Sequence, residues 1–217
     1  KAAFLGLFLT VLSPFFLFTS ASYFSHTTCL LMISVFFYSY LKWMRTDNEK
    51  QRIFWAGIAA FAVGYGLMTR YLTMAAIAAP FLIHYYWPLL WRKRSWKTSD
   101  WIAPAIIAVF FLLILWQNYE ITGKPFKAPN KFDKSWERLG FRADYTPLTG
   151  LYYLCARVFY LMDWFPGIFL VLFSVSCFTK RISTPYQQIT RYVFFAPVIA
   201  YFFYYSWGGN QWGPRYY

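Results

Sequence analysis

Long apolar stretches separated by short groups of charged residues dominate the pattern along this chain. Forty residues without Asp, Glu, Lys or Arg separate Lys1 from Lys42, and further uncharged stretches of sixteen to twenty-three residues follow. A helix needs about 20 mostly apolar residues to cross the ~30 Å hydrocarbon core of a bilayer. Each later stretch therefore predicts one spanning helix, and the first predicts two. The expected spans are 2–19, 27–43, 53–69, 71–91, 101–118, 164–179 and 192–207.

These spans predict an all-α fold, a polytopic transmembrane helical bundle with about seven spans. A bilayer offers no partner to free backbone N–H and C=O groups, and the ten-residue alternation of a membrane barrel is not found. We expect residues 1–217 to form a single transmembrane domain with a long outer loop and interfacial helices. Because the sequence begins and ends abruptly beside apolar segments, we expect this domain to be partial, with a first span, a first outer loop and a C-terminal part beyond it.

The composition supports a membrane protein and excludes several other classes. Hydrophobic residues make up 59% of the chain and charged residues only 13%, against about 25% charged in ordinary soluble domains. A disordered chain, a disulfide-stapled secreted module and a soluble enzyme are therefore excluded. The net charge of +13 would suggest nucleic acid in a soluble protein. Here the charges flank apolar runs, so we expect membrane lipids and no nucleic acid as partners.

The basic residues predict which side each loop occupies. Twelve of them lie at Lys1 and in the short loops 42–52, 92–97 and 180–191, and nine lie on the other side. Short cytoplasmic loops are enriched in Lys and Arg. The long segment 119–163 and the C-terminal end are therefore expected to face the periplasm, the lumen or the exterior. We expect a multi-pass protein of the bacterial inner membrane.

Two short polar turns are expected on the outer side. The turn Thr69-Arg70-Tyr71 joins two spans, and its guanidinium suits two oxygens of a lipid phosphate at once. An arginine that merely snorkels to the headgroups is the alternative. The elbow that ends at His26 places an imidazole at the mouth of the bundle, where it suits a phosphate or a sugar hydroxyl. A helix-capping turn is the alternative there.

Two longer outer segments carry the remaining candidate residues. Loops as long as 119–163 are often functional, although a basic loop that rests on anionic headgroups is the alternative. Its part 151–162 is apolar all round and predicts an interfacial helix. The segment 204–217 concentrates glycines, aromatic rings, an amide and an arginine, with an interfacial turn as the alternative. The candidates are Lys124, Arg157 and Asp163 in the loop, and Trp207, Asn210, Arg215 and Tyr216 in the late segment.

Small residues in the third span are expected to serve helix packing. Ala56, Ala60 and Gly64 recur every four residues, which lets two helices approach closely. The three cysteines lie in or beside apolar segments without metal-ligand spacing, so we expect them to be packing residues as well.

Four motifs together resemble one family of membrane enzymes. Ser13–His26 resembles the segment after an early span in polytopic glycosyltransferases of the GT-C fold, in the protein mannosyltransferase and aminoarabinose transferase-like branch. Residues 64–70 resemble that branch's Gly-x-x-x-x-Thr-Arg turn, and residues 118–125 resemble its outer-loop opening. Residues 207–217 resemble its late outer motif. The four occur in the family's order and cover nearly the whole chain.

This resemblance implies a glycosyltransferase that moves a sugar from a polyprenyl-phosphate or dolichyl-phosphate donor to an acceptor on the outer side. The anomeric carbon is attacked and the lipid phosphate leaves, usually with inversion. In the family a carboxylate of the first outer loop acts as general base or orients the acceptor, while Arg and Lys stabilise the leaving phosphate. That loop is expected before Lys1, so no catalytic residue is assigned within this chain.

The resemblance also implies roles for the candidate residues. The acceptor, whether glycan, lipid or protein, stays open, and so does a divalent metal; no cofactor is assigned beyond the donor lipid. The phosphate contacts are expected from Arg70, Arg215, Lys124 and Arg157, the sugar or acceptor contacts from His26, Trp207 and Asn210, and further substrate contacts from Asp163, Tyr71 and Tyr216.

Two other classes of function remain open at this point. A transporter of a lipid-linked or anionic solute would need ionisable residues near mid-membrane, and only His84, nearer the inner side, is a candidate. A non-catalytic membrane protein whose basic loop binds lipid is the other class. Replacing Arg70 or Arg215 by alanine separates it from the enzyme, because only an enzyme loses transfer activity.

Overall fold

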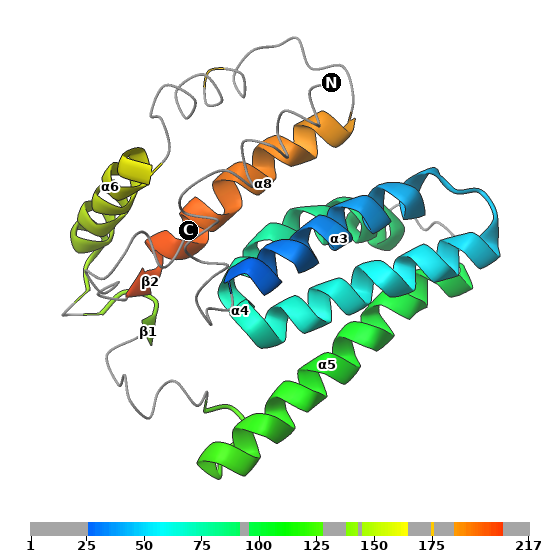
Figure 1. The fold of residues 1–217 in the computed structure, drawn as a ribbon, viewed down its shortest axis with the longest axis horizontal. Helices are drawn as coiled ribbons and strands as arrows, with labels where there is room; N and C mark the ends of the chain where they lie inside the picture. The colour runs from blue at the N-terminus through cyan, green and yellow to red at the C-terminus, as the bar shows by residue number, and fades with distance from the viewer. Residues whose placement is uncertain are drawn as a thin grey trace.

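Long helices dominate the computed structural model, which describes residues 26–91, 96–127, 138–142, 145–164, 175 and 185–205 (Figure 1). Apart from connecting loops, a two-residue antiparallel ladder and an isolated bridge between Arg142 and Tyr145, the described residues are helical, in agreement with the predicted all-α bundle. The elements are α3 (His26–Arg45), α4 (Glu49–Trp91), α5 (Thr98–Thr122), β1 (Arg138–Leu139), α6 (Pro147–Trp164), α8 (Pro185–Phe202) and β2 (Tyr204–Tyr205).

Three of the described helices, α3, α4 and α5, are long and apolar enough to cross a membrane. Only 17% to 28% of their most apolar windows is buried inside the chain. Large apolar side chains therefore face outward along all three, and exposed patches of this size mark contact with lipid or with other protein. The predicted span 2–19 lies outside the described residues, as does 164–179 except for residues 164 and 175.

Helix α4 is a hairpin of two arms, 49–69 and 71–91. The chain turns at Arg70, whose backbone is not helical (φ −147°, ψ 79°). Arg52 Nη2 donates to Tyr85 Oη at 2.8 Å although 33 residues separate the two. A straight helix would hold these residues about 50 Å apart at 1.5 Å per residue. The predicted pair of helices joined by a tight turn at 69–71 is therefore confirmed, and their crossing of a membrane stays a prediction.

Helix α3 packs along the hairpin and supplies the aromatic part of the core. Phe36, Tyr40 and Trp43 are each no more than 1% exposed. Tyr40 Oη donates to the carbonyl of Phe81 at 3.3 Å, and the Phe36 and Phe81 rings meet edge to face at 5.4 Å. These contacts join α3 to the second arm, and the core lies between them.

Small residues let α5 run close beside the first arm. Ala56 and Ala60 are buried, and a Cβ built on Gly64 would lie only 2.8 Å from Phe110 Cβ and nearer still to its ring. The expected packing role of this stripe is confirmed. Gly57 lies opposite Ile102 and Ile106, and Gly64, seven residues later, lies opposite Phe110. The first arm of α4 and α5 therefore run parallel. Beyond Phe110, α5 diverges from the hairpin (Figure 1).

Gly64→Ala is expected to lower the free energy of unfolding by about 1–3 kcal/mol, because a methyl group inserted against Phe110 overpacks the interface. Gly57→Ala is the matched control on the same helix. Its Cβ would meet Ile106 at 3.8 Å and Ile102 at 4.0 Å, which is ordinary contact, so it should be neutral or slightly stabilising. Unfolding in detergent with increasing denaturant measures both, and equal effects would contradict the packing.

Two predicted boundaries differ from the structure. The helix predicted as the last span, 192–207, is found as α8 at 185–202, and the chain leaves the helix because Tyr204 and Tyr205 pair with β1. That α8 crosses a membrane stays a prediction. The helix predicted at 151–162 is present but begins at Pro147, a residue whose fixed φ suits the first position of a helix. The location of α6 at a membrane interface stays a prediction.

The bundle has two distinct ends. The start of α3, the turn of α4 and the end of α8 lie at one end, which we call the Arg70 end (left in Figure 1). The end of α3, the junction between α4 and α5 and the start of α8 lie at the other, the Asp100 end. The loops predicted on the inner side, 42–52, 92–97 and 180–191, adjoin the Asp100 end. The two ends therefore match the alternation of sides predicted from charge.

Candidate functional site

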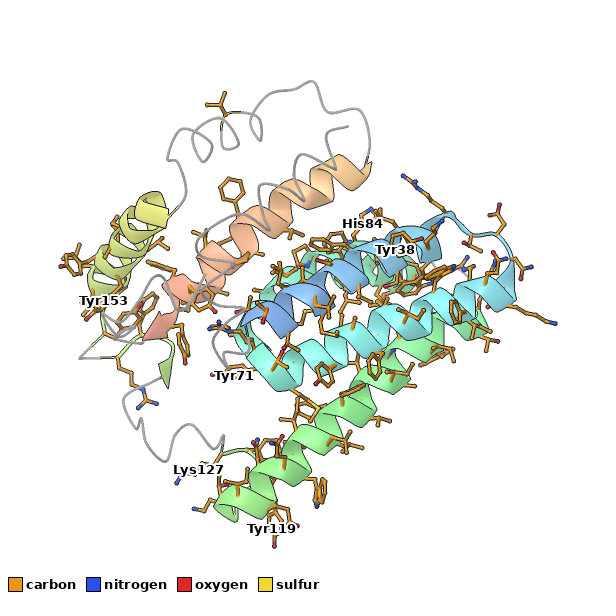
Figure 2. The ribbon with its side chains drawn as sticks, in the orientation of Figure 1. Tyr38, Tyr71, His84, Tyr119, Lys127 and Tyr153 are labelled. Carbon is orange, nitrogen blue, oxygen red and sulfur yellow. The ribbon has the colours of Figure 1, made fainter. Side chains whose placement is uncertain are left out.

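The turn at Arg70 is built by its small and hydroxyl neighbours. Thr69 Oγ1 donates to the carbonyl of Gly66 at 2.9 Å and closes the last turn of the first arm. A Cβ on Gly66 would lie 2.7 Å from Met74 Cγ, so only glycine lets the two arms meet this closely. Arg70 is half-buried at the tip, and Tyr71 beside it is 48% exposed (Figure 2). The turn thus presents a guanidinium and a phenol from a rigid scaffold.

The start of α3 lies against this turn. Cys29 is 2% exposed, and its thiol lies close enough to interact with Thr69 and Arg70. Cys29 follows His26 by one helical turn, so the backbone of His26 also belongs to this end. The side chain of His26 lies outside the described residues. The structure thus brings the last residue of the first motif near the second motif.

The end of α8 lies against the same hairpin. Tyr201 is 5% exposed, and its Oη hydrogen-bonds with Thr73 Oγ1 at 2.7 Å, one turn after Arg70. Tyr145 Oη donates to the carbonyl of Phe202 at 2.9 Å, and the Gly140 N–H donates to that of Phe203 at 2.7 Å. The start of α6 and the strand β1 are thereby joined to the end of α8. The late motif begins two residues after β2, outside the described residues.

The motif at residues 118–125 closes the end of α5. Gly123 adopts a left-handed conformation (φ 68°), and its N–H donates to the carbonyl of Tyr119 at 2.8 Å. Thr122 Oγ1 lies 2.7 Å from the carbonyl oxygen of Asn118, whose own Nδ2 donates to the carbonyl of Pro125 at 3.0 Å. Asn118, Thr122 and Gly123 are therefore explained by their role in capping the C-terminal end of α5.

Gly123→Ala is expected to fray the last turn of α5, because a left-handed residue with a Cβ costs about 1–2 kcal/mol. Gly123→Asn is the matched control, since asparagine tolerates this conformation. Amide hydrogen exchange at residues 119–122 measures both variants. Faster exchange in the alanine variant alone is expected, and equal exchange in the two would contradict the capping role.

Lys124 is exposed and directly follows the cap of α5. Figure 2 shows Tyr119 and Lys127, which flank it, at the far end of α5. The expectation that Lys124 contacts the donor phosphate stays a prediction.

The remaining predicted site residues lie outside the described side chains. The backbone of Arg157 and Asp163 belongs to α6, but their side chains are not described. Within the described part of the chain, no group of three or more His, Cys, Asp and Glu side chains is arranged to hold a metal ion. The residues wholly outside it are Trp207, Asn210, Arg215 and Tyr216.

A buried charge cluster at the Asp100 end was not predicted. Asp100 is fully buried, and its carboxylate accepts hydrogen bonds from Tyr85 Oη and, at 2.8 Å, from the Lys97 N–H. Arg52 Nη2 lies 3.4 Å from Asp100 Oδ1 and also donates to Tyr85. Tyr86 Oη donates to the Asp100 carbonyl at 2.9 Å. The cluster joins both arms of α4 to the start of α5.

The sequence carried a weak signal for this cluster. Arg52 and Asp100 each stand at the edge of an apolar run, where charges are commonly solvated. An acid at the third position of a helix and two adjacent tyrosines before it did indicate a local polar network. The pairing itself depends on the hairpin, which brings residues 48 positions apart into contact.

His84 lies between α3 and the second arm of α4. Its Nδ1 lies 3.2 Å from Tyr40 Oη. It adjoins Tyr85 of the Asp100 cluster in sequence, which agrees with its predicted position nearer the inner side. The contact gives the imidazole a partner within the core.

Comparison with known protein families, curated proteins and solved structures finds no match. The function is therefore inferred from the chain's own residues and geometry.

Proposed function

We propose that this chain is part of a membrane glycosyltransferase that takes a sugar from a polyprenyl-phosphate donor and transfers it to an acceptor on the outer, periplasmic or luminal, face. In the proposed reaction the acceptor hydroxyl attacks the anomeric carbon, the bond from that carbon to the phosphate oxygen breaks, and the lipid phosphate leaves. The acceptor's proton passes to a carboxylate that acts as general base, as the family resemblance implies.

One observation carries the proposal: the helix that follows the first motif, the turn that contains the second and the helix that precedes the late motif meet at the Arg70 end. Cys29, three residues after the first motif, lies near Thr69 of the second. Thr73, three residues after the second motif, hydrogen-bonds with Tyr201 on the helix that leads to the late motif. These segments are far apart in sequence, so a shared site is a better explanation of their motifs than separate turns.

The chemistry of the Arg70 end suits a lipid phosphate. A guanidinium binds two phosphate oxygens at once and stays charged at any physiological pH. Apolar, outward-facing surfaces of α3, α4 and α5 adjoin this end, and they suit the hydrocarbon tail of a lipid substrate. The positive-inside rule puts the Arg70 end on the outer face. We propose Arg70 as the main phosphate contact, with Tyr71 beside it.

The test is a transfer assay on the full-length protein in lipid nanodiscs. A polyprenyl-phosphate sugar labelled in the sugar is the donor, and a membrane extract supplies the acceptors. The proposal expects label in the acceptor fraction and an equal amount of free polyprenyl phosphate. A donor that stays intact would contradict it. In sealed vesicles, movement of intact donor between leaflets would instead favour a transporter.

A further inference from the structure

The hydrogen bond between Thr73 and Tyr201 is the contact that fixes the Arg70 turn relative to α8. Its two oxygens lie 2.7 Å apart, and 128 residues separate the partners. Thr73 occupies the first turn of the second arm, so a shift there moves Arg70 with it. Tyr201 is buried and its ring also meets Tyr204 edge to face at 6.1 Å. The pair therefore joins the turn to a packed part of the structure.

Three residues from α6, β1 and their flanking segments contact the backbone at the end of α8. Tyr145, next to the start of α6, hydrogen-bonds with the Phe202 carbonyl, and Gly140, which follows β1, hydrogen-bonds with the Phe203 carbonyl. Gly150 approaches the same Phe202 carbonyl so closely that a Cβ would lie 3.1 Å from it. The junction at residues 201–204 is thus a fixed point where α6, β1 and α8 meet. Thr73 is the place where the hairpin contacts it by a side-chain hydrogen bond.

We infer that Tyr201 and Thr73 are positioning residues: together they hold the Arg70 turn in the orientation in which its guanidinium receives the donor phosphate. This inference rests on the proposed function. Neither residue needs to touch the substrate, because each acts through the turn. Loss of the hydroxyl pair should weaken donor binding more than the later steps, since the turn becomes less well oriented before the donor arrives.

Tyr201→Phe and Thr73→Val each remove one oxygen from the pair and little volume. Each is expected to raise KM for the polyprenyl-phosphate donor about 5-fold, the effect of one neutral hydrogen bond of about 1 kcal/mol, while kcat changes less than 2-fold. Thr73→Ser keeps the hydroxyl and should restore the KM of the natural chain. The double variant should be no worse than either single variant, because both remove the same bond.

Tyr40→Phe is the matched control. Tyr40 is a fully buried tyrosine whose hydroxyl contacts His84 and Phe81, but it packs in the core between α3 and the second arm, away from the turn. It should lose a similar amount of stability and leave the donor KM unchanged. If one variant fails to assemble, the partner variant still tests the same bond.

The outcomes separate the inference from the function on which it rests. A natural chain that transfers sugar, with a donor KM unchanged in both Tyr201→Phe and Thr73→Val, overturns the positioning role alone. Equal rises of KM in Tyr40→Phe and Tyr201→Phe overturn it too, since a general loss of stability then explains both. A natural chain that consumes no donor overturns the proposed function and this role together.

Discussion

Arg70→Ala is expected to lower kcat/KM for the polyprenyl-phosphate donor by about 100-fold or more. Removing one donor to a charge that develops in a site shielded from water typically costs a factor of this size. The turn of the hairpin is Thr69-Arg70-Tyr71, and it carries no second arginine that could replace the guanidinium of Arg70. The transfer assay in nanodiscs measures the loss directly.

Two companion variants separate charge from geometry. Arg70→Lys keeps the positive charge and loses the planar fork, so we expect a smaller loss of about 10-fold. Arg45→Ala removes an exposed arginine at the Asp100 end and should change kcat/KM less than 2-fold. The phosphate role of Arg70 would be contradicted if Arg70→Ala and Arg45→Ala behaved alike while both proteins kept their helix content.

Arg52→Ala is expected to lower the free energy of unfolding by about 3–5 kcal/mol, because it leaves the carboxylate of Asp100 buried without its cationic partner. Asp100 is fully buried and Arg52 nearly so, so little water reaches the orphaned group. The loss should appear in denaturant unfolding, and it should leave the donor KM of the surviving folded protein unchanged, since the cluster lies at the other end of the bundle.

Lys50→Ala provides the control for this second prediction. Lys50 is exposed on the same turn of α4, and its removal should change stability by no more than about 0.5 kcal/mol. Replacing the pair together, as Arg52→Met with Asp100→Leu, should recover much of the lost stability, because no unpaired charge remains. If the double variant loses as much unfolding free energy as Arg52→Ala, or more, the unpaired carboxylate does not explain the loss. The ion pair itself would then stabilise the fold.

Hydropathy alone was sufficient to predict the spans that the structure describes. The uncharged runs 27–43, 53–69 and 71–91 coincide with α3 and the two arms of α4, and 101–118 falls inside α5. The run lengths carry this information because a bilayer requires it. The stripe of small residues likewise predicted a close helix contact, although not which helix it would meet.

Tertiary contacts decided what the sequence left open. The end of the last helix was predicted too late because Tyr204 and Tyr205, just after α8, pair with Leu139 and Arg138, which lie 65 and 67 residues earlier in the chain. The Asp100 cluster was missed for the same reason, since its members become neighbours only when α4 folds back.

The proposal that the Arg70 end receives the donor is tested most directly by photo-crosslinking. A polyprenyl-phosphate sugar with a photoreactive group near the phosphate is bound to the full-length protein in nanodiscs, and mass spectrometry locates the adducts. Adducts at 66–73, at the start of α3 and at the end of α8 are expected, and they should decrease in Arg70→Ala. Adducts at the Asp100 end, or spread evenly along α5, would contradict the account.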